Sequence, residues 1–271
     1  MVNIPAFEDL VVTIDGVVAT IRLNRPKSLN SFRLETYGEL AKALNVINSI
    51  PEITITVITG TGKFFSSGMD LAAAAARKII ADPVEHKEAR WKELTGGGVA
   101  LIFALIEHTK VTVVALNGGA IGYPGAWIGG ADIIVASDKA YLYLPFMKLG
   151  LSAETGVTHT WTARANEGFA ADFLYTNKRM TVKELGLKGI QRVWPDAEFD
   201  AKLKEMIDDM KTGNARSMLE AKKLMKDPSR IAYRNSVMLE TLYMVNRPAG
   251  ASNTAFAQRA AEIASKKTAK L

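Results

Sequence analysis

The chain of 271 residues contains no cysteine, which excludes disulfide bonds, thiolate nucleophiles and metal sites built on sulfur. Its three histidines, His86, His108 and His159, stand apart without the spacing of a metal site, so we expect structural or surface roles for them. No apolar run approaches the ~18 residues of a membrane span. The N-terminus also lacks a basic region followed by an apolar one, so we expect neither a span nor a secretory signal.

The charges are also too evenly spread to indicate a nucleic-acid partner. There are 34 basic and 28 acidic residues, for a net charge of +6, and the basic residues do not form a stripe interleaved with aromatic ones. We therefore expect no nucleic-acid binding, because such binding needs a concentrated basic surface. A small ligand that carries phosphate is compatible with this charge.

The most informative features are two glycine-bearing segments, each of which follows an apolar, strand-like run. Residues 64–70 (FFSSGMD) follow the run 53–59, and residues 117–125 (NGGAIGYPG) follow the run 111–116. A turn that leaves a strand and opens a helix presents unpaired backbone N–H groups. Two such turns that face each other can hold an oxygen that becomes negative during a reaction, as an oxyanion hole. The alternative is a pair of ordinary strand-to-helix turns.

The periodicity of the chain predicts an α/β core followed by helices. Residues 8–15 and 17–23 predict a hairpin, and residues 32–47 predict a helix with Ser31 or Asn30 as its N-cap. Further short strands are predicted at 132–136 and 140–144, and helices at 83–108, 157–165, 167–175, 182–187, 199–211, 215–226, 230–245 and 254–267. We predict a core of residues 1–195 and a helical C-terminal region of residues 196–271.

Four motifs, in order, resemble the crotonase (enoyl-CoA hydratase/isomerase) superfamily. They are residues 24–30 (NRPKSLN), 64–70, 117–122 (NGGAIG) and 132–138 (DIIVASD), and the resemblance covers roughly residues 8–195. It implies an α/β fold, a spiral of ββα units with a C-terminal helical region. It also implies acyl-CoA thioester substrates whose enolate is stabilised, and assembly through the C-terminal helices into a homotrimer or homohexamer.

The resemblance assigns the oxyanion hole to the backbone N–H groups of Met69 and Tyr123. Such donors are fixed before the reaction, and a helix N-terminus adds its dipole. Gly68 and Gly122 are implied to let the two turns bend tightly and admit the ligand.

The acidic positions distinguish members of the superfamily. Hydratases carry two glutamates at the positions of Ala126 and Phe146, and both residues are apolar here. The simple Δ3,Δ2-enoyl-CoA isomerases carry only the acid that corresponds to Glu154, which is present. The resemblance therefore implies that Glu154 moves a proton from C2 to C4 of a 3-enoyl thioester. Without it, Glu154 would be interpreted as an exposed loop carboxylate or a helix N-cap. A hydratase or lyase of a specialised acyl-CoA, or a non-catalytic acyl-CoA binder, is the alternative function.

The resemblance also implies contacts to coenzyme A, which is part of the substrate, so neither a separate cofactor nor a metal is expected. The residues assigned to this binding site are Lys27, Ser28, Leu29, Ser66, Ser67, Gly68, Asp70, Gly122 and Phe256. Lys27 is alternatively a solvated surface lysine, Phe256 a helix-packing residue, and Asp70 a helix N-cap.

The last three residues, Ala269-Lys270-Leu271, are a close variant of the Ser-Lys-Leu address that the peroxisomal import receptor reads. We therefore expect localisation to the peroxisome and a role in fatty-acid β-oxidation.

Overall fold

The computed structural model describes residues 4–70, 73, 80–248, 258 and 261, and the statements below concern these residues. Phe256, the C-terminal tripeptide and most of the predicted helix 254–267 lie outside them.

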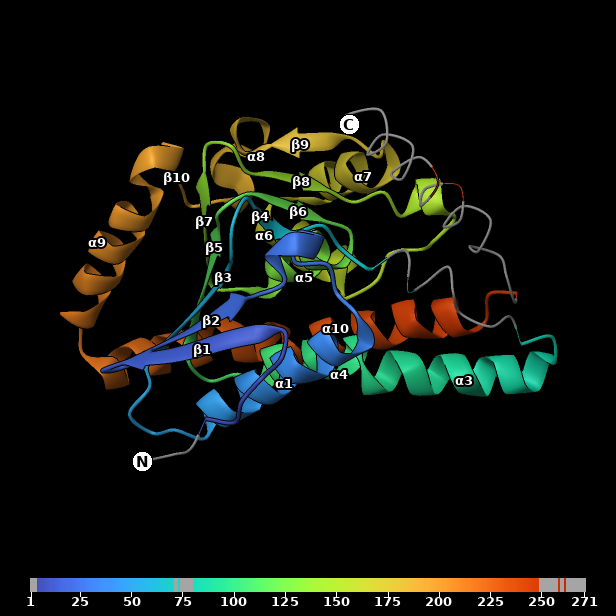
Figure 1. Cartoon of the computed structure of the whole chain (residues 1–271), viewed down its shortest axis with the longest axis horizontal. Helices are drawn as coiled ribbons and strands as arrows, with labels where there is room; N and C mark the ends of the chain where they lie inside the picture. Colours follow the sequence, from blue (N-terminus) through green and yellow to red (C-terminus); the bar gives the residue numbers. More distant parts are fainter. Residues whose placement is uncertain (1–3, 71–72, 74–79, 249–257, 259–260, 262–271) are drawn as a thin grey trace.

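The larger of two β-sheets has six strands in the order β1-β2-β3-β5-β7-β10 (Figure 1). The hairpin of β1 and β2 is antiparallel, as predicted, and all the other neighbours pair in parallel. The strand bounds are Leu10–Asp15, Val18–Leu23, Ile55–Gly60, Val111–Leu116, Ile133–Ser137 and Arg192–Trp194.

A second sheet of four short strands was not predicted, although one of its strands was, at residues 140–144. It has the order β4-β6-β8-β9, with bounds Phe64–Ser66, Gly119–Ile121, Tyr141–Tyr143 and Arg179–Thr181. The first three strands pair in parallel and β9 is antiparallel to β8. Thus β4 and β6 lie within the glycine-bearing segments, which were predicted only as turns.

The chain repeatedly forms one strand of the large sheet, then one strand of the small sheet, and then a helix. Strand β3 is followed by β4 and helices, β5 by β6 and α5, and β7 by β8 and α6. Successive first strands lie side by side in the large sheet, and successive second strands lie side by side in the small one. This arrangement is the predicted spiral of ββα units.

Helices cover the large sheet on both faces. Helices α1, α3, α4 and α10 lie together below the sheets in Figure 1, and α9 lies apart at its left. The bounds of α1 and α3 to α10 are Leu34–Asn48, Pro83–Gly96, Gly98–Glu107, Tyr123–Trp127, Val157–Arg164, Glu167–Tyr175, Val182–Gly189, Phe199–Lys211 and Ala215–Val245. Four 3-10 turns, η1 to η4, span Pro26–Ser28, Ile128–Gly130, Met147–Leu149 and Asp196–Glu198.

The central strands are buried on both sides because helices pack on both faces. In β5, for example, Val114 and Leu116 join the main core, whereas Val113 and Ala115 join a smaller core beneath α9. Side chains alternate between the faces of a strand, so one apolar run supplies both cores.

Two predicted helix details are wrong. Arg33, not Ser31 or Asn30, is the N-cap of α1, because Phe32 first pairs in a strand-like bridge with Met69. The helices predicted at 215–226 and 230–245 form the single helix α10, with Pro228 inside it. The division at residue 195 stays a prediction.

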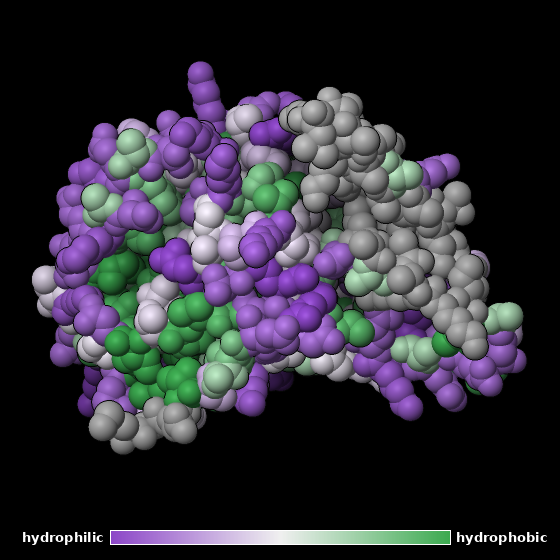
Figure 2. Space-filling view, viewed as in Figure 1, coloured by the Kyte–Doolittle hydropathy of each residue, from purple (hydrophilic) through white to green (hydrophobic). Residues whose placement is uncertain are grey.

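Apolar side chains gather over the β1–β2 hairpin on the face shown in Figure 2, where Val11 and Ile14 are 41% and 43% exposed.

None of the helices among the described residues is long and apolar enough to cross a membrane.

Candidate active site

The two glycine-bearing turns lie against each other because the strands that precede them are neighbours. In the small sheet, Phe64 pairs with Gly119 and Ser66 with Ala120, in parallel, so both turns leave the same edge. A Cβ atom on Gly68 would lie 2.6 Å from the Ile121 carbonyl oxygen. Gly68 also has a φ of +91°, which favours glycine. This close approach therefore requires glycine.

The backbone N–H groups of Met69 and Tyr123 are the donors predicted from the resemblance. On either side of Met69, the Gly68 N–H donates to Ser66 Oγ and the Asp70 N–H donates to the Phe32 carbonyl. Tyr123 is the first residue of α5, where an N–H has no acceptor within the helix. Within the described part of the chain, neither the Met69 N–H nor the Tyr123 N–H has a hydrogen-bond acceptor. Both remain available to a ligand.

Gly122, the N-cap of α5, leaves space beside these donors. It has a φ of +61°, and a Cβ atom built on it would meet no described atom within 4 Å. The N-terminus of α5 also directs its partial positive charge toward this space.

The Tyr123 side chain belongs to the wall of the site. It is buried, its hydroxyl donates to the Gly98 carbonyl at 2.6 Å, and its ring packs edge-on against Tyr37 at 4.7 Å. Burial raises the pKa of Tyr123 well above its usual value, so the hydroxyl stays neutral. This leaves the main-chain N–H as the group that Tyr123 can offer to a reaction.

Glu154 lies in the loop between η3 and α6 and lines the same cavity as Tyr123. The cavity has a volume of about 20 Å³ and is closed by residues of α3, α4 and α10. Burial raises the pKa of Glu154 from 4.5 to about 7; the charge of Arg90 opposes the rise and that of Glu240 adds to it. A carboxyl with such a pKa exchanges protons readily near neutral pH.

The loop that carries Glu154 is held in an unusual backbone conformation. Thr155 and Gly156 have φ values of +72° and +73°, and a β-branched residue is rarely found there. A Cβ atom on Gly156 would lie 2.3 Å from the Tyr233 ring of α10. The hydroxyls of Ser152 and Thr155 are buried and have no partner among the described residues. Unpaired groups and strain of this kind are typical of functional sites.

Glu240, which the sequence analysis missed, fixes this loop from α10. Its carboxylate accepts hydrogen bonds from the Gly156 N–H at 2.5 Å, the Thr158 N–H at 3.1 Å and the Thr158 hydroxyl at 2.6 Å. A buried carboxylate at the N-terminus of α6 is stabilised by the helix dipole and by these donors. A glutamate on the buried face of α10, three residues after Val237, is the signal that could have identified it.

The two positions that carry glutamates in hydratases hold no acid here. Ala126 is buried on α5, and Phe146 is buried before η3. Glu154 is thus the one acidic residue among those that line the small cavity within the described part of the chain.

Five of the residues predicted to contact coenzyme A lie on two segments that hydrogen bonds join, residues 27–29 and 66–67. The Ser67 N–H donates to the Leu29 carbonyl at 2.9 Å, and its hydroxyl donates to the Ser28 carbonyl at 3.3 Å. Lys27 is exposed beside them, and Ser66 is buried. The assignment of these residues to coenzyme A stays a prediction.

Asp70, for which a helix N-cap was the alternative role, accepts three hydrogen bonds. Its Oδ1 accepts the Ala73 N–H at 3.3 Å, while Oδ2 accepts hydrogen bonds from Ser31 at 3.3 Å and Arg25 at 3.5 Å. These contacts tie the first glycine turn to the segment before α1.

Comparison with known families gives this geometry a context. Residues 13–252 match the model of the family described as "Enoyl-CoA hydratase/isomerase". The chain belongs to this family. The predicted superfamily is thus confirmed.

Two relatives of this family member illustrate the similarity. The human protein "Enoyl-CoA delta isomerase 2" is 33% identical over 194 residues, which cover 71% of the chain and 48% of that protein. The "3,2-trans-enoyl-CoA isomerase" of Saccharomyces cerevisiae is 31% identical over 174 residues, covering 63% of the chain and 62% of the relative. In each case the chain spans less than two thirds of the curated relative's length.

A solved structure is similar over more of its length. It is a putative enoyl-CoA hydratase from Thermobifida fusca in complex with acetoacetyl-CoA, with a TM-score of 0.72 and 26% identity. The similarity covers 87% of this chain and 95% of that one.

Proposed function

We propose that the protein is an enoyl-CoA isomerase that converts a 3-enoyl-CoA into the 2-trans-enoyl-CoA. The observation that carries the proposal is Glu154, a lone carboxyl with a pKa of about 7 in the cavity that Tyr123 also lines. The names of the human and yeast relatives and the acyl-CoA ligand of the related structure support this class of substrate.

The proposed reaction uses two hydrogen-bond donors, the N–H groups of Met69 and Tyr123, and one group that moves a proton, Glu154. The Glu154 carboxylate takes a proton from C2, and the electron pair moves into the thioester carbonyl to form an enolate. The N–H groups of Met69 and Tyr123 stabilise the oxygen as its charge grows, which is worth about 10²–10³ in rate for each donor. Glu154 returns the proton at C4, and the double bond moves to C2–C3. No atom is gained or lost.

The pKa of Glu154 suits both halves of this reaction. At about 7, the group is partly ionised at neutral pH, so it can accept the first proton and then donate it. The apolar Ala126 and Phe146 provide no second carboxyl that would position a water molecule for hydration. This difference favours isomerisation over hydration.

Substrate binding requires the small cavity to widen. Its volume of about 20 Å³ corresponds to one water-sized space, whereas an acyl chain needs far more. Side chains of α3, α4 and α10 form its wall, among them Leu94, Ile102 and Met244. Movement of these apolar side chains would admit the acyl chain while the oxyanion donors stay fixed in the turns that follow β4 and β6.

The remaining parts of the proposal rest on the sequence. Coenzyme A would be held by residues 27–29 and 66–67, with Phe256 as a further contact, and no separate cofactor would be needed. The C-terminal Ala269-Lys270-Leu271 would direct the enzyme to the peroxisome and to β-oxidation. Exposed apolar residues of α10, among them Leu224 and Ile231 at 77% and 71% exposure, are suited to a homotrimer or homohexamer.

The test is spectrophotometry of 3-hexenoyl-CoA conversion to the conjugated thioester, with Glu154→Gln against wild type. Glu88→Gln, at an exposed position of α3, is the matched control. We expect Glu154→Gln to lower kcat by about 10²–10⁴ and Glu88→Gln to leave it unchanged. Unchanged turnover in Glu154→Gln would refute the assignment. Hydration of 2-enoyl-CoA without isomerisation would identify a hydratase instead, and binding without any turnover would identify a non-catalytic acyl-CoA binder.

A further inference from the structure

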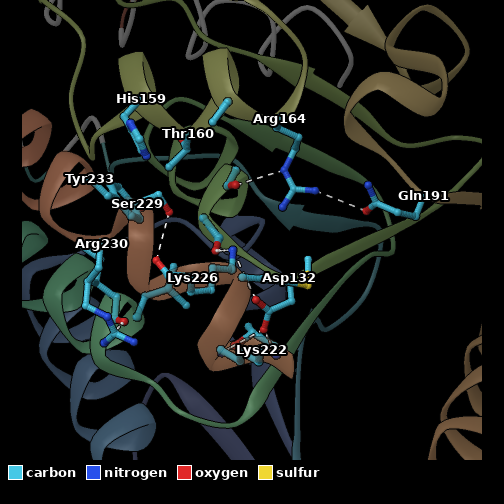
Figure 3. Close-up of a pocket in the computed structure, with 17 residues that line it drawn as sticks. Asp132, His159, Thr160, Arg164, Gln191, Lys222, Lys226, Ser229, Arg230 and Tyr233 are labelled. Carbon is cyan, nitrogen blue, oxygen red and sulfur yellow. Dashed lines mark hydrogen bonds and ion pairs between the residues drawn. The ribbon is translucent and has the colours of Figure 1, made fainter. Parts of the chain in front are cut away.

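A second and larger cavity lies between α6 and α10, beside η2 (Figure 3). Its volume is about 330 Å³, and it shares no lining residue with the cavity of Glu154. Exposed Ala163 and Met225 lie among its lining residues, so it is open to solvent there. The proposed isomerisation does not use it.

The lining of this second cavity has more positive than negative charge. Asp132 is its one carboxylate among the described residues, and it pairs with Lys222 at 2.9 Å and Lys226 at 3.3 Å. Arg164 donates to the Gly129 carbonyl at 3.1 Å and to the Ala131 carbonyl, which are neutral. Burial lowers the pKa of Lys222 and of Arg164, as expected of cations with too little counter-charge.

Arg230 does not add to this excess, because other acids neutralise it. Its guanidinium pairs with Glu107 at 3.0 Å and with Asp227 at 3.1 Å. Three cations, Arg164, Lys222 and Lys226, therefore share one carboxylate.

Two buried hydroxyls in the same cavity have no protein partner. The Tyr233 hydroxyl and Thr160 Oγ1 make no hydrogen bond to any described residue, although Tyr233 and Thr160 are only 8% and 5% exposed. The glycines of η2 make room for both. A Cβ atom would lie 2.7 Å from the Tyr233 hydroxyl at Gly130, and 2.8 Å from Thr160 Oγ1 at Gly129.

We propose that this cavity binds a phosphate-sized dianion, either inorganic phosphate or the phosphoryl group of a small metabolite. Lys226 and Arg164 supply the positive charge, and Tyr233 and Thr160 donate the hydrogen bonds that they lack within the chain. Figure 3 shows Arg164 and Lys226 on the two helices that border the cavity, and His159 near Tyr233. The His159 ring stacks on that of Tyr233, with centroids 5.7 Å apart, and so holds the phenol in place.

The volume favours a ligand larger than bare phosphate. A space of about 330 Å³ accommodates a dianion together with a small organic group, because pockets for small organic ligands start near this size. The proposal is independent of the proposed isomerase reaction.

Calorimetric titration with inorganic phosphate, and separately with glucose 6-phosphate, tests the site at an ionic strength held constant with sodium chloride. Tyr233→Phe removes only the hydroxyl, which has no partner to lose, so the fold is not at risk. We expect Tyr233→Phe and Lys226→Gln each to weaken binding by about tenfold or more, because each removes a hydrogen bond to a charged ligand.

Lys223→Gln is the matched control, since Lys223 is an exposed residue of α10 that pairs with Asp227 outside this cavity. It should bind as wild type does. Tighter binding of glucose 6-phosphate than of inorganic phosphate would identify a phosphorylated metabolite, and the reverse would identify free phosphate. No saturable binding of either ligand, or equal binding in wild type, Tyr233→Phe and Lys226→Gln, would overturn the proposal.

Discussion

Glu154→Gln should make the protein more stable at alkaline pH while it lowers activity. Folding raises the pKa of Glu154 from 4.5 to about 7, because the carboxylate loses solvent. A carboxyl with a raised pKa favours the folded state while it is protonated, and the folded state loses that advantage as the pH rises through about 7. Glutamine has nearly the same shape but no charge, so it avoids this loss.

The size of the effect follows from the two pKa values. At a pH well above 7, a rise of the pKa from 4.5 to about 7 lowers the free energy of unfolding by about 3 kcal/mol, because each pKa unit corresponds to about 1.4 kcal/mol. The Glu154 side chain is half-buried, so solvent screens part of its charge and we expect about 2 kcal/mol. Well below pH 4.5, where the carboxyl is protonated in both the folded and the unfolded state, the difference should be close to zero.

Urea denaturation of wild type, Glu154→Gln and Glu88→Gln at about pH 5 and about pH 9 measures this difference. Other titrating groups are common to all three proteins, so they cancel when variants are compared at one pH. The stability gain of Glu154→Gln must grow with pH, whereas Glu88→Gln must match wild type throughout. A Glu154→Gln variant that is no more stable than wild type at the higher pH would refute the argument, because Glu154 would then ionise as a solvated carboxyl does.

Three further substitutions test other parts of the site. Gly68→Ala should lower stability by about 2 kcal/mol or more in urea denaturation, because a Cβ atom would lie 2.6 Å from the Ile121 carbonyl oxygen and φ is +91°; a variant as stable as wild type would show that the turn can relax. Tyr123→Phe should lower the free energy of unfolding by about 1–2 kcal/mol, because the hydroxyl hydrogen bond is lost. It should keep kcat within about tenfold of wild type, because the proposed oxyanion donor is the main-chain N–H. Complete loss of turnover in a folded variant would instead show that the hydroxyl is catalytic. Glu240→Gln should cost about 2–4 kcal/mol, because an amide cannot accept all the donors that the carboxylate accepts. It should also move the pH–rate profile to lower pH, because the charge of Glu240 raises the pKa of Glu154; an unshifted profile would contradict this coupling.

The elements with strong local patterns were predictable from the sequence. The apolar runs that form β3 and β5 appear close to their true bounds, and α7 and α9 appear with the predicted bounds. Burial on both faces makes such strands largely apolar, so they can be recognised without knowledge of their neighbours.

The elements that depend on distant partners were not predictable. Strands β4, β6, β9 and β10 have three residues each, too few to show a period, and they exist because neighbouring strands pair with them. Pro228 lies inside α10, where proline removes a backbone hydrogen bond. Side chains on both sides of it anchor α10 to the core, through Lys222 to Asp132 and through buried Tyr233, and these contacts offset that cost.

The candidate site shows the same division between local and distant causes. The glycine turns could be predicted from the local sequence. Glycine is required at position 68 because φ is positive there and because a Cβ atom would be too close to the Ile121 carbonyl oxygen. The position of Glu154, by contrast, depends on a carboxylate 86 residues later in the chain, because Glu240 accepts the Gly156 N–H and caps α6. Burial is the main cause of the raised pKa of Glu154, and the charge of Glu240 adds to it, so α10 affects both the place and the pKa of the proposed proton shuttle. Any change that moves α10 should alter the pH dependence of turnover before it alters the oxyanion donors, because Met69 and Tyr123 lie just after β4 and β6 of the small sheet.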